Sequence, residues 1–216
     1  MKKLKCPIAR YKDEPIYITL PYGSKAFVEQ YKKLGWDLTH HNGIDLVNST
    51  NAQKAYGTPV YASQDGVVTR SIYDTSVSTK GNGLTIEGLP FVKDGKEMLL
   101  ITTYWHLADL SAKTGDFVKA GQIIGTLGNT GYAIGGHPSP FKGTHIHYMV
   151  FPYERVNGKW QKCEPNNGVG GAVNAELWLE DNWKEKAQTI TYDKKVDIVS
   201  ILGIIKRSIE YIKSKL

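Results

Sequence analysis

GTHIHYMV, at residues 143–150, sets polar and apolar side chains in alternation. His145 and His147 are two positions apart, so on an extended strand both imidazoles project from one face. Ile146 and Tyr148 then line the opposite, mostly apolar face. The alternation predicts a half-buried strand that carries two histidines on its polar side.

Similar short segments recur from about residue 15 to residue 150, separated by Gly, Asn and Pro. The chain has 22 glycines and 13 tyrosines, which favours strands joined by tight turns. We therefore predict a mainly β fold, built as an antiparallel sheet or a β-sandwich-like core. The predicted strands are residues 16–20, 57–63, 65–73, 83–88, 98–107, 121–128 and 145–151.

Three segments depart from the strand pattern. Residues 24–34 favour a helix that Gly35 can end. Residues 157–171 are rich in Gly, Asn and Lys, which is typical of a loop. Residues 190–216 predict a basic amphipathic helix, because apolar side chains step by four and three positions there. These apolar positions are Ile198, Leu202, Ile205, Ile209, Ile212 and Leu216.

The chain length of 216 residues allows one substantial domain with small appendages. We expect an N-terminal extension at residues 1–16, a main domain at 17–185 and the amphipathic helix at 190–216. That helix could pack on its own domain, associate with a second copy, or lie on a membrane surface.

The net charge of +6 predicts attraction to polyanions. The basic residues are scattered and form no nucleic-acid-binding motif, so nucleic acid is not an expected partner. Anionic wall polymers or anionic lipids fit the charge equally well. The sequence has no 18-residue apolar run, so no transmembrane span is expected.

The two cysteines, Cys6 and Cys163, are far apart in sequence and outside any C-x-x-C spacing. They indicate neither a disulfide framework nor a cysteine zinc site, and whether they pair is left open. The N-terminus begins with basic residues but lacks an apolar stretch before Lys12, so no classical signal peptide is expected.

A second polar cluster occurs in HHNGIDL, at residues 40–46. On an extended strand His41, Gly43 and Asp45 share a face, and His40 points away. Gly43 leaves room between the imidazole and the carboxylate. A half-exposed polar strand could show the same pair. Combined with the histidines at 145 and 147, however, the pattern offers two imidazoles and one carboxylate, a donor set that suits zinc with one open position.

The stretch MLLITTYWHL, at residues 98–107, predicts a strand that ends near His106. Alternation places His106 on the same face as Tyr104 and opposite Trp105. A single histidine after an aromatic residue is more often structural than catalytic. A functional role for His106 therefore depends on its lying near the other histidines.

Taken together, these motifs resemble the lysostaphin-like zinc metalloendopeptidases that degrade peptidoglycan. That family carries H-x-x-x-D, an aromatic residue before H-L, and H-x-H, which here stand at 41–45, 104–107 and 145–147. It also carries G-T-P-V-x-A-x-x-D-G-x-V and G-x-x-V-x-x-G-Q-x-I-G-x-x-G-N-T-G, which match residues 57–68 and 115–131. The resemblance spans residues 17–152 and keeps the order of the motifs.

The resemblance implies a role for each site residue. His41, Asp45 and His147 would bind one zinc ion per chain, while His106 and His145 would hold and deprotonate the attacking water; which of them is the general base is left open. Relatives have a tyrosine six residues before the first ligand, where this chain has Gly35. Residues that could contact substrate instead are Tyr31, Trp36 and Tyr104.

The implied activity is that of a bacteriolytic endopeptidase that cuts crosslinks or stem peptides of peptidoglycan. The substrate peptide would lie in a groove across the sheet. The place of action would be the bacterial cell wall. With no signal peptide expected, a phage lysin or a virion component is the predicted origin. Residues 135–142, which include His137, lengthen the loop before His145 relative to the family pattern, so the cleaved bond is not predicted.

Two other kinds of function remain open at this stage. A binding or activator module of the same fold would lack catalysis, although all five site residues are present here. Some segments also resemble lipoyl-carrier and sugar-phosphotransfer domains. The carrier alternative needs a modifiable lysine at a hairpin tip, which the sequence does not offer, and phosphotransfer does not need Asp45.

Overall fold

The computed structural model describes residues 3–74, 76, 80–133, 141–187 and 189–190. Most of the predicted amphipathic helix, residues 191–216, lies outside the described residues, as does His137. None of the helices in the described ranges is both long and apolar enough to cross a bilayer.

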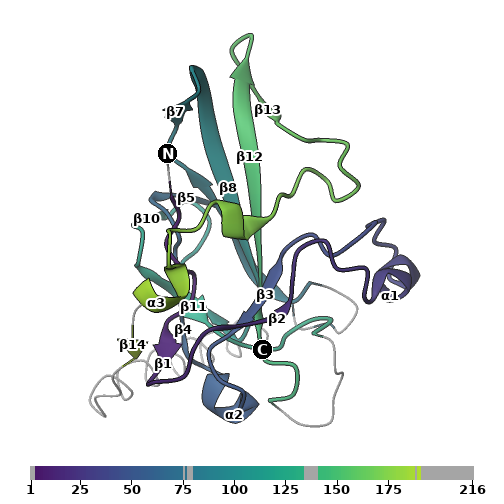
Figure 1. The fold of residues 1–216 in the computed structure, drawn as a ribbon, viewed down its shortest axis with the longest axis vertical. Coiled ribbons are helices and arrows are strands. Elements are labelled where there is room, and N and C mark those ends of the chain that lie inside the picture. Colours follow the sequence, from purple (N-terminus) through teal and green to yellow (C-terminus); the bar gives the residue numbers. More distant parts are fainter. Residues whose placement is uncertain (1–2, 75, 77–79, 134–140, 188, 191–216) are drawn as a thin grey trace, which may run out of the picture.

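The described residues form a mainly antiparallel β fold, as predicted (Figure 1). The main sheet follows the spatial order β10 (Phe117–Val118), β5 (Gly66–Ile72), β6 (Asn82–Gly88), β8 (Lys96–Leu107), β12 (Ile146–Val156), β3 (Ile44–Val47) and β2 (Tyr17–Leu20). At one end, β7 (Phe91–Lys93) pairs with β8 and β13 (Lys159–Lys162) pairs with β12. The long strands β8 and β12 run side by side through the centre and extend beyond the body.

A smaller sheet completes the hydrophobic core. It consists of β4 (Pro59–Tyr61), β11 (Ile123–Thr126) and β9 (Asp109–Leu110). Val60 and Ile124 from this sheet belong to the same buried cluster as Leu84 and Ile146 from the main sheet. The core therefore lies between the two sheets, in agreement with a sandwich-like arrangement.

The short helices are α1 (Val28–Lys33), α2 (Ala52–Ala55) and α3 (Trp183–Lys186), with a 3₁₀ turn at Ala175–Leu177. The predicted helix at 24–34 is shortened because Phe27 has a left-handed backbone, with φ of 66°. Helix α2 was not predicted. It begins where the Asn51 side chain accepts hydrogen bonds from the backbone N–H groups of residues 53 and 54.

The loop predicted at 157–171 is partly wrong, because β13 occupies its first third. Asn157 and Gly158 have φ of 49° and 77°, the conformation of a tight hairpin turn. The returning strand pairs Trp160 with Arg155, whose guanidinium lies 5.8 Å from the indole ring.

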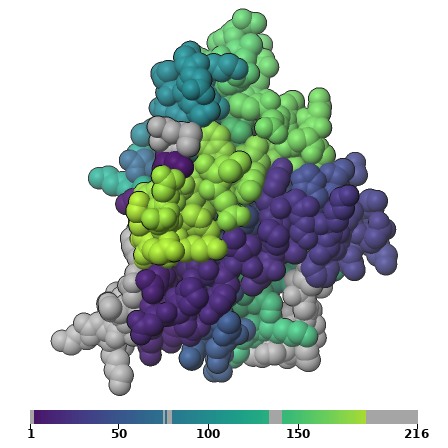
Figure 2. Space-filling model, viewed as in Figure 1, coloured from purple at the N-terminus to yellow at the C-terminus, as the bar shows by residue number. Residues whose placement is uncertain are grey.

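The described part of the N-terminal extension packs onto the main domain. Leu4 and Ile8 are almost fully buried. The backbone of Leu4 forms hydrogen bonds with Trp178 and Glu180, and the N-terminal and late segments lie against each other on the surface (Figure 2). The parallel pair of β1 (Arg10–Tyr11) with β14 (Thr189–Ile190) adds a second link between them.

Candidate metal centre

The register of β3 and β12 places Asp45 directly opposite His147. The neighbouring pairs, Leu46 with Ile146 and Ile44 with Tyr148, are fully buried in the core. Because side chains alternate along a strand, burial of these neighbours turns the carboxylate and the imidazole to the opposite face of the sheet.

His41 does not lie on a strand as predicted, but in the loop that leads into β3. Its backbone N–H donates to the carbonyl of Ser24 at 2.7 Å, and its own carbonyl accepts from Gly23 at 3.0 Å. These bonds hold the loop so that His41 comes to Asp45. His40 points elsewhere: its Nδ1 lies 2.9 Å from the Thr39 hydroxyl, outside the cluster.

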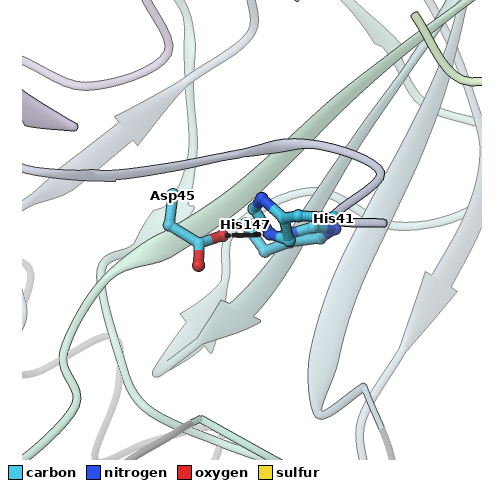
Figure 3. A group of neighbouring side chains, drawn as sticks. All are labelled: His41, Asp45 and His147. Carbon is cyan, nitrogen blue, oxygen red and sulfur yellow. Dashed lines mark hydrogen bonds and ion pairs between the residues drawn. The ribbon is translucent and has the colours of Figure 1, made fainter. Parts of the chain in front are cut away.

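Three donor atoms converge at this position (Figure 3). Asp45 Oδ1 lies 2.8 Å from His147 Nδ1 and 3.1 Å from His41 Nε2, and the two nitrogens are 3.0 Å apart. Donors about 2.1 Å from a tetrahedral zinc ion are about 3.4 Å from one another. The observed triangle is smaller by about 0.3–0.6 Å, so a small outward shift of the side chains would admit the ion.

In His41 and His147, the outer nitrogen, which is the one that points away from the triangle, lies close to an oxygen acceptor. His41 Nδ1 lies 3.1 Å from the Pro21 carbonyl, and His147 Nε2 lies 3.1 Å from Asn42 Oδ1. When the outer nitrogens donate to these oxygens, the inner nitrogens are free to bind a metal ion beside the Asp45 carboxylate. The residues present therefore fit a zinc ion.

The local electrostatics favour the forms that bind metal. Burial lowers the pKa of His147 to about 4, although Asp45 opposes this shift. Burial on its own would raise the pKa of Asp45, but His145, His147 and His41 outweigh it and hold that pKa well below its usual range. Near neutral pH the His147 imidazole is thus neutral and the Asp45 carboxylate is ionised.

His106 and His145 stand beside these three residues, with ring centroids 4.7 Å apart. His106 Nδ1 donates to the Thr130 carbonyl at 2.8 Å, and His145 Nδ1 donates to the Gly143 carbonyl at 2.7 Å. The Nε2 atom of His145 lies 3.6 Å from Asp45 Oδ2, so this ring also faces the donor triangle. Burial, followed by the charges of His145 and His147, lowers the pKa of His106 to about 3 and so keeps that ring neutral.

A β-bulge brings His106 to the site. Asn82 pairs with Leu107 and Gly83 pairs with Trp105, so His106 has no partner in β6. Its φ is 66°, a left-handed conformation that costs energy for any residue except glycine. The bulge turns His106 to the same side as Trp105, and both line the pocket.

The bulge also overturns the prediction that Tyr104 contacts substrate. Tyr104 has an exposed fraction of 0% and packs against Tyr148 in the core, with ring centroids 5.3 Å apart. Its hydroxyl accepts a hydrogen bond from the backbone N–H of Ser63. Tyr104 therefore stabilises the sheet behind the site and does not reach the pocket.

The pocket around the five clustered residues has an aromatic wall. Tyr31 stacks on Trp36, and Tyr132 meets Trp36 edge to face. Sequence reasoning proposed Tyr31 and Trp36 for this region but missed the others. Asn42 was recognisable from its place between two donors, and Trp105 from its place before His106. The remaining lining residues are Leu38, Lys80 and Tyr132.

Comparison with known families gives an independent view of this site. The family model of Peptidase family M23 matches residues 39–162, which is more than half of the chain. The chain belongs to peptidase family M23. Members of this family are zinc metallopeptidases, and the matched range includes all five clustered site residues.

Curated M23 relatives act on cell walls. The peptidoglycan DD-endopeptidase ShyC of Vibrio cholerae is 39% identical over 118 residues, which cover 55% of this chain and 21% of ShyC. Lysostaphin of Staphylococcus simulans is 35% identical over 196 residues, which cover 82% of this chain and 35% of lysostaphin. This chain thus spans about a third or less of the length of these two relatives.

Solved structures of the family share the fold. The LytM protein of Ruminococcus gnavus superposes with a TM-score of 0.52 at 23% sequence identity, covering 88% of this chain and 64% of that one. The mainly antiparallel architecture is therefore that of the M23 peptidases.

Proposed function

We propose that this protein is an active zinc-dependent endopeptidase that hydrolyses peptide crosslinks or stem peptides of bacterial peptidoglycan. The observation that carries the proposal is the convergence of five residues on one pocket. His41, Asp45 and His147 would hold one zinc ion per chain, and His106 and His145 would act on the water that attacks the peptide bond.

The geometry supports this division of roles. When bound, zinc acts as a Lewis acid toward the scissile carbonyl and makes water acidic enough to attack near neutral pH. His106 or His145 can take up the water proton at Nε2 and deliver it to the leaving amine. Between these two proton transfers, the protonated ring can stabilise negative charge on the carbonyl oxygen.

A non-catalytic binding or activator module of the same fold is the alternative. The presence of both non-ligand histidines argues against it, because a binding module has no need for two further imidazoles beside the donor triangle. The strained backbone of His106 gives the same indication, since strain of this kind is kept where a side chain must be aimed.

The experiment is a peptidoglycan digestion that counts newly released amino groups. We expect release by the zinc-loaded protein, loss after chelation and recovery when zinc is restored. Protein that binds zinc and cell wall but releases no amino groups would support the binding module instead. Mass spectrometry of the products would identify the cleaved bond.

We also propose that the peptidase domain spans residues 17–185, with residues 1–16 packed on it as an extension. The expected place of action is the bacterial cell wall. We further propose that the protein is a phage lysin or a virion component. The helix proposed at 190–216 would serve self-association or membrane contact. Light scattering with and without residues 191–216 would address the first of these two roles.

A further inference from the structure

Lys80 lines the pocket that contains the donor triangle. Its ammonium nitrogen lies 5.9 Å from the ring centroid of Trp36 and 5.8 Å from that of Trp105. These distances fit cation–π contacts with both indoles. The ammonium group is therefore held at the aromatic wall, although Lys80 remains exposed to solvent.

The backbone that carries Lys80 is fixed. Asn82 donates its backbone N–H to the Thr130 hydroxyl at 2.9 Å. Gly81 and Gly131 pack so closely that a Cβ on either would overlap backbone atoms of the opposite segment. Trp105 is held in the same way, because its indole lies directly over Gly83. Lys80 thus has a defined place next to the metal centre.

The charge of Lys80 lacks a counterpart in this pocket. None of the ion pairs found between described residues includes Lys80. Asp45 is the only acidic residue among the described residues that line the pocket, and it faces the donor triangle. Desolvation of the ammonium group by the surrounding protein and the neighbouring charge of Arg70 lower the pKa of Lys80, and a bound anion would oppose this shift.

We propose that Lys80 binds a carboxylate of the substrate beside the scissile peptide bond. The protein then prefers peptides that carry a free carboxylate there, such as those of the peptidoglycan stem, over uncharged bridges of glycine type. The aromatic wall strengthens this pairing because it excludes water from one side of the ammonium group. The inference rests on the proposed peptidase function and names the substrate class of the same pocket.

The test uses two synthetic peptides that differ only in a carboxylate or a carboxamide on the residue next to the cleaved bond. For the zinc-loaded protein we expect kcat/KM to favour the carboxylate peptide about 10- to 100-fold, the range of a charge-assisted hydrogen bond. Lys80→Met keeps the aliphatic stem over the indoles but should bring this ratio close to one. Lys80→Arg should retain most of the preference, and Lys113→Met, an exposed lysine outside the pocket, should retain all of it.

A ratio near one in the unaltered protein, or an unchanged ratio in Lys80→Met, would overturn the proposal and leave Lys80 as a bridge between the two tryptophans. Calorimetric binding of both peptides separates this outcome from failure of the proposed function. If neither peptide is cleaved, the peptidase proposal fails. A binding preference for the carboxylate that Lys80→Met abolishes would still support the role of Lys80, and equal binding would refute it.

Discussion

His41 Nε2 and His147 Nδ1 lie 3.0 Å apart. The outer nitrogen of each ring lies 3.1 Å from a protein oxygen that can accept its proton. Asp45 adds a carboxylate oxygen within 3.1 Å of both inner nitrogens. A cation bound by all three atoms would stabilise this close approach. The fold therefore brings together a donor set that fits a metal ion.

Separate variants should distinguish metal binding from catalysis. His147→Ala removes one corner of the triangle and should lose bound zinc. His106→Ala leaves the triangle intact and should keep about one zinc per chain, while kcat falls roughly 10²- to 10⁴-fold, the usual contribution of general acid–base catalysis. Zinc content by elemental analysis, together with cell-wall hydrolysis, measures both effects.

The matched control is His40→Ala, because His40 lies next to a proposed ligand in sequence but outside the cluster. This variant should keep both zinc and activity. Retention of zinc by His147→Ala would contradict the ligand assignment, and full activity in His106→Ala would remove that residue from the mechanism.

Gly43 should be required for the shape of the centre. A Cβ at this position would lie 2.6 Å from the Tyr148 carbonyl oxygen and 2.8 Å from His147 Cε1. Gly43→Ala should lower the free energy of unfolding by about 1–3 kcal/mol, as overpacking does, and should weaken zinc binding by displacing the imidazole. Urea unfolding and zinc titration measure the two effects.

Gly95→Ala provides the comparison for Gly43→Ala. Gly95 has φ of 74°, but no neighbouring atom lies within 4 Å of the position that a Cβ would take, so its substitution adds backbone strain without crowding. We expect a cost of about 1 kcal/mol and unchanged zinc affinity. Equal zinc affinity in both variants would show that crowding at Gly43 does not reach the metal centre.

Much of the site was predictable from strand periodicity. The alternation around His145 and His147 correctly separated the pocket face from the core. The position of His106 was not predictable in the same way, because a bulge depends on the hydrogen-bond register between two strands. Lys80 was missed for a different reason: it lies between motifs, just before β6, and reaches the pocket only through tertiary packing. The hairpin at Asn157 and Gly158, in contrast, carried a readable turn signal.

Because His106 has a left-handed backbone, a glycine variant at this position should be more stable than an alanine variant. In an ordinary strand, a protein with glycine is less stable than one with alanine at the same position by about 0.5–1 kcal/mol. At a φ of 66°, alanine is strained and glycine is not. His106→Gly should therefore be more stable than His106→Ala by about 1 kcal/mol in urea unfolding of the metal-free protein. Thr103, in the same strand, should show the normal order, and the same order at both positions would contradict a strained bulge.

The metal-free protein should lose stability in mild acid. The folded-state pKa values of His106 and His147, about 3 and about 4, lie below the value of about 6.5 expected in the unfolded chain. As the pH falls below 6.5, the unfolded chain binds protons that the folded chain excludes, so the free energy of unfolding decreases. Each histidine contributes up to about 1.4 kcal/mol per pH unit within its window.

The lowered pKa of Asp45 acts in the same direction, but only as the pH falls through the unfolded value of about 3.9. Unfolding measured from pH 6.5 to pH 4.5 therefore reports mainly on the two histidines. His106→Gln removes one titrating ring, and its pH dependence should be shallower by up to about 1.4 kcal/mol per unit. An identical slope in this variant would mean that His106 binds a proton as readily in the folded state as in the unfolded chain, and it would contradict the lowered pKa.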